Sequence, residues 1–204
     1  MAILPLIQYP DPLLAKISQP IDLANGVSKE IEELSYSMAE SMYHYKGVGI
    51  SAIQVGQPLR LIVYDVMQDQ PKSHLNYLIN PEMFHEDGTP FSRPKNQITL
   101  KGQTIDSKEG CLSVSFVFEN VQRLSSILVK AYNLRGEKIQ YLATGDEAIC
   151  IQHEIDHLDG ILFIDRMSRL KKQMALKNKD GRMRLAAKNM LTDLYVNKKS
   201  INLM

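Results

Sequence analysis

Apolar residues near the start of the chain recur at the spacing of an α-helix. They are separated by three or four residues, which would place them on one face: Ile31, Leu34, Met38, Met42 and Tyr45. Ser28 precedes the run and is followed closely by acidic residues, as is typical of a helix N-terminus. Gly47 is the kind of residue that ends a helix. The pattern therefore predicts an amphipathic helix over residues 28–46.

Four shorter stretches predict β-strands because apolar residues dominate them. They cover residues 59–66, 75–79, 121–133 and 138–142. The second is expected to end at Asn80-Pro81, and the last two are joined by a turn at residues 133–136. Residues 82–108 are polar and contain glycines and prolines, so they are expected to form a long loop or a hairpin excursion.

A second helix is predicted between Thr144 and Gly160. Its apolar residues lie on several faces, which indicates a central, buried helix. After Asp165 two amphipathic helices are expected, near residues 168–177 and 182–196. One face of these helices is expected to pack on the body of the protein through Leu170, Met174, Met190, Leu191 and Leu194.

The central helix carries the pattern H-E-x-x-H. His153 and His157 lie on one face of such a helix and can hold a single metal ion, while Glu154 can reach a water molecule beside it. The same letters also occur by chance on surface helices. Here the neighbouring apolar residues predict burial, and buried histidines beside a buried acid need polar partners. The pattern favours metal-assisted hydrolysis.

A third protein ligand is needed, with a further position left open for water. Cys150 shares the face of His153, but it lies about 10.5 Å of helix rise from His157 and is expected to be a small apolar wall residue. Cys111, in the stretch E-G-C-L-S, offers a thiolate that suits zinc or iron. Glu109 and Asp156, which lie beside these residues, are expected to support the ligands as hydrogen-bonded acids, with Arg123 and Arg166 as candidate partners.

A third stretch, residues 47–54, combines two glycines and small residues with the amide of Gln54. It would admit a ligand close to the backbone, although a tight turn explains it equally well.

Length and composition indicate one domain. The chain has 204 residues, of which 44% are hydrophobic and 23% charged, as is ordinary for a globular protein with a real core. It contains no run of 18 apolar residues, and its start lacks the features of a secretory signal, so neither a membrane span nor secretion is expected. Its two cysteines argue against a disulfide scaffold.

The net charge of +1 conceals an asymmetry. Residues 166–204 hold eleven Lys/Arg and two acids, a net of +9, whereas residues 1–165 hold 13 bases and 21 acids, a net of −8. A basic tail of this kind is either a solvated helix face or a surface for RNA, such as the ribosome.

The three motif stretches, in this order, closely resemble the peptide deformylase family, whose motifs read G-x-G-x-A-A-x-Q, E-G-C-L-S and H-E-x-D-H. The chain matches them at residues 47–54, 109–113 and 153–157, and the resemblance spans roughly residues 5–168. It departs from them at Ser51, which replaces a usual alanine, and at Ile53, where proline is common. Ser115-Phe116 also stand where Pro-Gly often follows the cysteine motif.

The resemblance implies an α+β fold in which small antiparallel β-sheets surround the H-E-x-x-H helix, with C-terminal helices. A catalytic domain of residues 1–168 would be followed by a basic helical extension of residues 169–204. The implied reaction is metal-dependent hydrolysis of the N-formyl group from formyl-methionine on nascent polypeptides, which releases formate. A cytoplasmic location of the bacterial type is expected, and neither DNA nor a membrane is expected as a partner.

The resemblance also assigns roles to residues. Cys111, His153 and His157 would hold one divalent ion, usually Fe²⁺ and alternatively Zn²⁺, Ni²⁺ or Co²⁺. Glu154 would transfer protons, while the Leu112 backbone N–H and the Gln54 side chain would stabilise the oxyanion. The methionine side chain would enter an apolar slot, and the peptide would run as an added strand; the residues expected to contact it are Val48, Gly49, Ile50, Gly110, Ile149 and Cys150.

Two alternatives share parts of this pattern. A zincin peptidase also carries H-E-x-x-H, but it would need a distal histidine or glutamate as third ligand, and the chain has no H-x-x-G-x-x-H extension. A non-catalytic ribosome-binding homologue would keep the basic tail but would lose Glu154 or a metal ligand, all of which are present.

Overall fold

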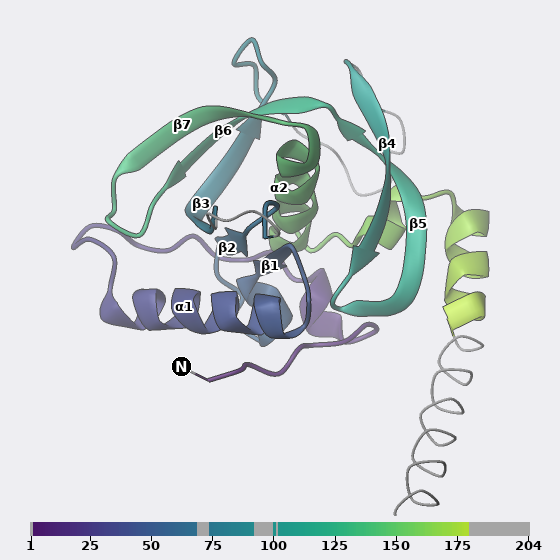
Figure 1. The fold of residues 1–204 in the computed structure, drawn as a ribbon, viewed down its shortest axis with the longest axis horizontal. Helices are drawn as coiled ribbons and strands as arrows, with labels where there is room; N and C mark the ends of the chain where they lie inside the picture. Colours follow the sequence, from purple (N-terminus) through teal and green to yellow (C-terminus); the bar gives the residue numbers. More distant parts are fainter. Residues whose placement is uncertain (1, 69–73, 92–99, 101, 180–204) are drawn as a thin grey trace, which may run out of the picture.

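The computed structural model describes residues 2–68, 74–91, 100 and 102–179. Its centre is helix α2 (Gly145–Leu158), which carries the H-E-x-x-H pattern. Two antiparallel sheets curve around this helix, and helix α1 (Lys29–His44) crosses the structure beside it (Figure 1). The predicted α+β fold, with small antiparallel sheets surrounding the central helix, is confirmed.

The larger sheet has five strands in the order β1-β2-β3-β6-β7. Their bounds are Gly49–Ser51, Leu61–Tyr64, Asn76–Phe84, Ser126–Tyr132 and Lys138–Thr144. β6 and β7 form the predicted hairpin. The expected end of β3 at Asn80-Pro81 is wrong, because the strand continues through a bulge between Ile79 and Glu82. Asn80 makes the irregularity tolerable: its side chain bonds both the N–H and the carbonyl of Ile21, each at 2.8 Å.

The smaller sheet pairs β4 (Thr104–Cys111) with β5 (Val114–Leu124). The expectation of a loop or hairpin excursion over residues 82–108 therefore holds only in part, since residues 82–84 end β3 and residues 104–108 begin β4. β4 has few apolar side chains and Glu109 is its buried acid, so the usual alternation of apolar and polar residues is missing. Residues 92–99 and 101, within the same excursion, lie outside the described residues.

Both central helices form where the apolar spacing predicts them. α1 begins after Ser28, as expected, but the residue with a left-handed backbone after its end is Lys46 (φ 59°), not Gly47. Gly47 is needed for a different reason. A Cβ atom there would lie 2.7 Å from Leu112 Cδ1, so this glycine allows the stretch after α1 to approach the end of β4.

The core lies on either side of the five-stranded sheet and around α2. One cluster packs Ile151, Ile155 and Leu158 of α2 against the sheet. A second packs Met38 and Met42 of α1 against strands that include β2. A third lies between β5 and the 3₁₀ turn at Phe163–Arg166. The central, buried position predicted for α2 is thus confirmed. Its packing against the sheet holds the residues of this helix in place relative to the strands.

The C-terminal part begins with a helical segment, residues 169–179. Ala175 is buried against the third cluster, but Leu170 and Met174 are 68% and 58% exposed, so the expectation that these two residues pack on the body is wrong. The segment is held instead partly by lysines, since Lys171 Nζ donates to the Asn120 carbonyl at 2.8 Å and Lys172 pairs with Asp165. The helix expected near residues 182–196, with its apolar positions, lies outside the described residues.

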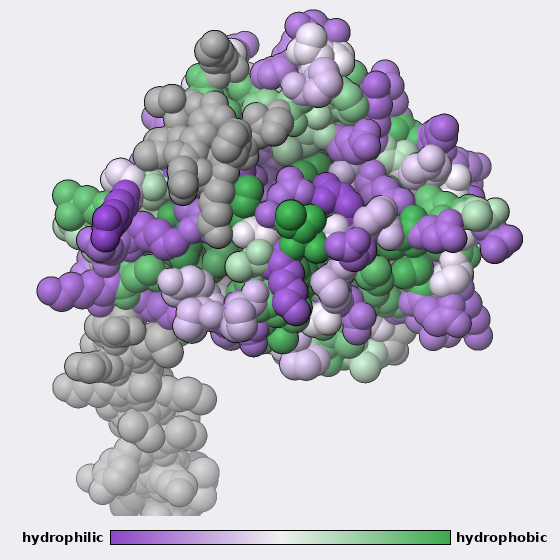
Figure 2. Space-filling model, turned by 180° about the vertical axis from the view of Figure 1, so that it is seen from behind, coloured by the Kyte–Doolittle hydropathy of each residue, from purple (hydrophilic) through white to green (hydrophobic). Residues whose placement is uncertain are grey.

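The surface is mixed in character. On the face seen in Figure 2, apolar side chains lie in small groups between hydrophilic ones. Among the described residues, no helix combines the length and apolar character that crossing a bilayer requires.

Candidate active site and metal centre

Cys111, His153 and His157 come together at the centre of the fold. Cys111 ends β4, and both histidines project from α2. One ligand atom from each residue can be chosen so that all three lie within 4.8 Å of one another, and Cys111 Sγ lies 3.2 Å from His157 Nε2. Cys150, also on α2, lies outside this group and faces the Val48 carbonyl at 3.7 Å.

The donor set fits a divalent transition metal. The ring of His153 is oriented by Glu109, whose Oε2 lies 2.8 Å from Nδ1, so Nε2 is left for a metal. His157 Nδ1 is buried and has no hydrogen-bond partner in the described part of the chain. Burial, and then the neighbouring His153, lower the pKa of His157 well below its usual value, which keeps the ring neutral as a ligand must be. One thiol and two imidazoles suit zinc or iron.

Glu154 lies beside this cluster with an unusual proton affinity. It is 3% exposed, and its Oε2 has no hydrogen-bond partner among the described residues. Burial raises the pKa of Glu154 to about 7, against the opposing effects of His153 and the Ser51 hydroxyl. A Cβ atom on Gly49 would lie 2.7 Å from Glu154 Oε1, so only glycine leaves this carboxylate its space. Near neutral pH, Glu154 can both take and return a proton.

Gln54 is held in one orientation by its own turn. It belongs to the 3₁₀ turn Ala52–Val55, and its Oε1 accepts hydrogen bonds from the Ser51 N–H at 2.8 Å and the Ser51 hydroxyl at 2.9 Å. The amide nitrogen therefore faces the cluster, where it lies 3.2 Å from Ser113 Oγ and 3.6 Å from Cys111 Sγ. It is a fixed donor beside the candidate metal centre.

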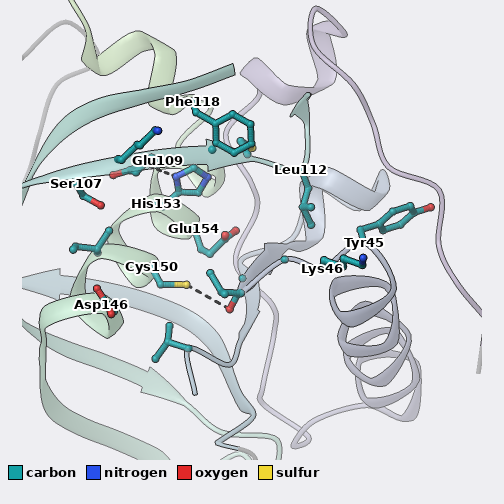
Figure 3. A pocket seen from close by; sticks show the side chains of 18 of the residues that line it. Tyr45, Lys46, Ser107, Glu109, Leu112, Phe118, Asp146, Cys150, His153 and Glu154 are labelled. Carbon is teal, nitrogen blue, oxygen red and sulfur yellow. Dashed lines mark hydrogen bonds and ion pairs between the residues drawn. The ribbon is translucent and has the colours of Figure 1, made fainter. Parts of the chain in front are cut away.

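These residues border a cavity of about 520 Å³. Most residues predicted from sequence line it: Val48, Gly49, Gln54, Gly110, Cys111, Leu112, Ile149, Cys150, His153 and Glu154. Figure 3 shows Leu112 at one side of the cavity and Cys150 at another, with His153 and Glu154 between them. The side chain of Ile50 does not line it; it is buried in the cluster beneath α1.

The sequence matches a known family over most of its length. The model of that family, described as polypeptide deformylase, matches residues 3–173. The chain belongs to the polypeptide deformylase family.

Individual deformylases resemble the chain over nearly their whole length. A peptide deformylase from Nitrosococcus oceani is 40% identical over 187 residues, which are 92% of this chain and all of that protein. One from Phenylobacterium zucineum is 37% identical, covering 87% and 95% of the two chains. The crystal structure of a deformylase from Legionella pneumophila superposes with a TM-score of 0.75 at 33% identity, covering 91% of this chain and 98% of the other.

A buried network of charges supports the deformylase site. Arg123 is 1% exposed and bonds both oxygens of Glu109, at 2.7 and 2.9 Å, and Asp156 Oδ2 at 2.6 Å. Arg166 adds a second guanidinium to Asp156. The expectation that Glu109 and Asp156 are supporting acids, partnered by these two arginines, is confirmed.

The arginines keep the two acids charged. Burial alone would raise the pKa of Glu109, but Arg123 and then His153 together outweigh it and lower that pKa to about 2. Arg123 and Arg166 likewise lower the pKa of Asp156 against the effect of burial. The His153 side chain is therefore oriented by a carboxylate that stays ionised throughout the neutral range.

Sequence reasoning missed several residues that line the cavity. They are Tyr45, Lys46, Val66, Ser107, Lys108, Phe118 and Asp146. Asp146 had a detectable signal, because it precedes Ile149 and Cys150 by three and four residues on the same helix. Ser107, Lys108 and Phe118 carried no such signal. Without a predicted strand, the sequence did not indicate which of their side chains share a face.

We expect Arg123→Met to lower the free energy of unfolding by about 3–5 kcal/mol, because it leaves the buried Glu109 carboxylate without its arginine and Asp156 with Arg166 alone. Urea unfolding at pH 7 measures this. Arg60→Met is the matched control: the Arg60–Asp159 pair has side chains 20% and 44% exposed, so its loss should cost about 1 kcal/mol or less. Equal losses in both variants would contradict the assigned role of Arg123.

The same variant should change the response to acid. The pKa of Glu109 is lower in the folded state than in the unfolded chain, so its stabilisation is complete above the ordinary glutamate pKa of 4.5 and disappears as the pH falls towards 2. Arg123→Met removes the cause of the shift. The wild type should therefore lose more stability between pH 5 and pH 3 than the variant does.

Proposed function

We propose that Glu154, Gln54 and Leu112 carry the catalysis of this deformylase, at a divalent metal held by Cys111, His153 and His157. The reaction of the family is hydrolysis of the N-formyl group of formyl-methionine at the start of new polypeptides, and it is the function of this chain. One observation supports the assignment most directly: the three ligand atoms lie within 4.8 Å of one another, and two of the three residues, Cys111 and His153, line the same cavity as Glu154.

The chain's own groups can perform the proton transfers. A divalent ion supplies Lewis acidity when bound, which polarises the formyl carbonyl and lowers the pKa of water. Glu154, with a pKa of about 7, takes a proton from the attacking water and returns one to the departing amine. Burial protects this exchange from bulk solvent, because Glu154 is 3% exposed.

The oxyanion that forms on the formyl carbon needs hydrogen-bond donors. The Gln54 amide is already oriented towards Cys111 by its bonds to Ser51. The Leu112 backbone is held by a hydrogen bond on the exposed surface, in which its carbonyl accepts from Gln8 Nε2 at 2.8 Å. We assign the Leu112 N–H and the Gln54 Nε2 to the oxyanion.

The peptide can bind as an additional strand. Among the described strands, β1 lies at the edge of its sheet and pairs with β2 alone, and β4 pairs with β5 alone. Gly49 of β1 and Gly110 of β4 both border the cavity. Backbone groups along Gly49-Ile50 and Gly110 would then bind the substrate backbone, while Val48, Ile149 and Cys150 would contact the methionine side chain.

Glu154→Gln should lower kcat for formate release from a formyl-Met peptide by about 10²–10⁴-fold, because the amide cannot transfer protons. Its metal content should match the wild type. His153→Ala and Cys111→Ala should lose metal and activity together, and Glu33→Gln, on the exposed side of α1, serves as a control that changes neither. A Glu154→Gln enzyme that stays within a few-fold of wild-type activity would show that the proton-transfer role is wrong.

We propose Fe²⁺ as the native metal. Cys111 ends a strand that borders the cavity and is partly exposed, so a metal-bound thiolate there can be reached by oxidants. Enzyme loaded with Fe²⁺ should lose activity in air faster than enzyme loaded with Ni²⁺. Metal analysis and mass spectrometry of Cys111 should record iron loss and added oxygen in parallel. Indistinguishable decay of the two forms would count against this assignment of iron.

We also propose that the basic residues after Asp165 contact ribosomal RNA. The structure already pairs three of them within the protein: Arg166 with Asp156, Lys171 with Glu119 and Lys172 with Asp165. No ion pair links Arg169 or Lys177 to another described residue, and Lys179 Nζ lies over the Tyr9 ring, 5.8 Å from its centroid. Arg169 and Lys177, with the basic residues of the sequence 180–204, supply the charge that remains for a polyanion.

The test of the tail should keep the residues of segment 169–179 that pack against the third core cluster, such as Ala175. A chain ending at Lys179, with Arg169→Ala and Lys177→Ala, should co-sediment with ribosomes less than the full chain at low salt. Its activity on short formyl-Met peptides should be unchanged. The control replaces Lys16 and Lys29, two exposed lysines of the body. A full-length chain that fails to co-sediment at any salt concentration would reject the ribosome proposal.

A further inference from the structure

The cavity is polar at the end away from the metal ligands. Helix α2 and strand β4 both extend from the metal ligands towards this end. Along α2, Asp146 precedes His153 by seven residues, about 10.5 Å of helix rise. Along β4, Ser107 precedes Cys111 by four residues, about 13 Å of strand. Asp146 and Ser107 both line the cavity, and Figure 3 draws both on the side away from Leu112 and Lys46.

Asp146 lines the same wall as the residues assigned to the first side chain of the substrate. Ile149 and Cys150 follow it by three and four residues, so one helix face presents all three to the cavity. A substrate side chain that starts near the metal and runs along Ile149 and Cys150 therefore points towards the Asp146 carboxylate. The wall formed by Ile149 and Cys150 is apolar and carries an acid at its far end, while Ser107 and Lys108 line the cavity from β4.

No residue in the described part of the chain neutralises the Asp146 carboxylate. Among the described residues, no hydrogen bond or ion pair engages its side chain, whereas Glu147, the next residue, bonds the Tyr64 hydroxyl at 2.8 Å. The negative charge of Asp146 is felt within the cavity, since it contributes to the raised pKa of the buried Cys150 thiol after larger effects of burial and nearer acids. It is thus available to a ligand.

We propose that Asp146 is a specificity-determining residue, which with Ser107 lets the slot accept formyl peptides whose first side chain ends in a cation or a hydrogen-bond donor. An entirely apolar slot would reject such a side chain, because its polar end would lose its water without gaining a partner. The inference rests on the proposed function. It extends the substrates from formyl-methionine to formyl peptides that begin with a long basic or polar residue.

A different role for Asp146 would be purely structural. It lies in the first turn of α2, where an acid stabilises the helix through its dipole. That role predicts a change in stability alone. It predicts no change in the relative rates on two substrates that differ only at the end of the first side chain, and this difference separates the two interpretations.

The experiment compares three formyl peptides that differ only in their first residue, which is methionine, norleucine or lysine. Each is assayed with holoenzyme loaded with one metal, and the measured quantity is kcat/KM for formyl-lysine divided by kcat/KM for formyl-norleucine. Both values come from one enzyme preparation, so the ratio does not depend on how much of the protein is folded or loaded with metal.

Asp146→Leu should lower this ratio by about three- to tenfold, the size expected for losing a partly exposed charge contact. Asp146→Asn should give a smaller decrease, because it keeps a hydrogen-bond acceptor. Asp106→Asn is the matched control: it removes an acid one residue from Ser107 that does not line the cavity, and the ratio should stay at the wild-type value. High salt should reduce the difference between Asp146→Leu and wild type.

The outcomes separate this inference from the proposed function. A wild-type enzyme that releases no formate from the formyl-methionine peptide, in any metal form, overturns both. Activity on formyl-methionine with a ratio that Asp146→Leu leaves unchanged overturns the role of Asp146 alone. An equal decrease in Asp106→Asn would also overturn it, since the effect would then come from overall charge and not from contact in the slot.

Discussion

The interaction on which the structure most depends is the buried guanidinium of Arg123. It extends from β5 to Glu109 of β4 and to Asp156 of α2, so one cation joins the small sheet to the central helix. The same Glu109 carboxylate orients His153. The position of this candidate metal ligand is therefore set by the charges of Glu109, Arg123 and Asp156 together. Two buried acids without Arg123 would repel each other across the ligands they support.

Close backbone approach is the second constraint. Gly47, Gly49 and Gly110 each lie where a Cβ atom would collide with a neighbour: Leu112, Glu154 and Phe118 respectively. None of the three has a positive φ, so they are required for space and not for backbone conformation. Their absence of side chains lets the stretch after α1, the end of β4 and helix α2 meet around one cavity.

The sequence was most informative where apolar spacing or chemistry was strong. Local pattern predicts the positions of α1 and α2 and the hairpin of β6 and β7. The motif resemblance adds the cavity residues that lie within the three motifs, while those outside them were mostly missed. β4 was missed because its side chains are mostly polar and its order comes from pairing with β5, a relation between residues up to twenty apart. Asp146 was missed because an acid in the first turn of a helix is ordinarily explained by its favourable interaction with the helix dipole. Leu170 and Met174 show that an amphipathic pattern does not ensure burial.

The pairing of Asp156 with Arg166 has a consequence for how the protein acquires its activity. Cys111 and His157 are 46 residues apart in the sequence. Asp156, which lies between the two histidines, is paired with Arg166, ten residues further along the chain. The centre thus depends on contacts between distant parts of the chain, whose closure slows folding. During its own synthesis the protein cannot complete the site until Arg166 has emerged, so almost the whole described chain must be made before the first turnover.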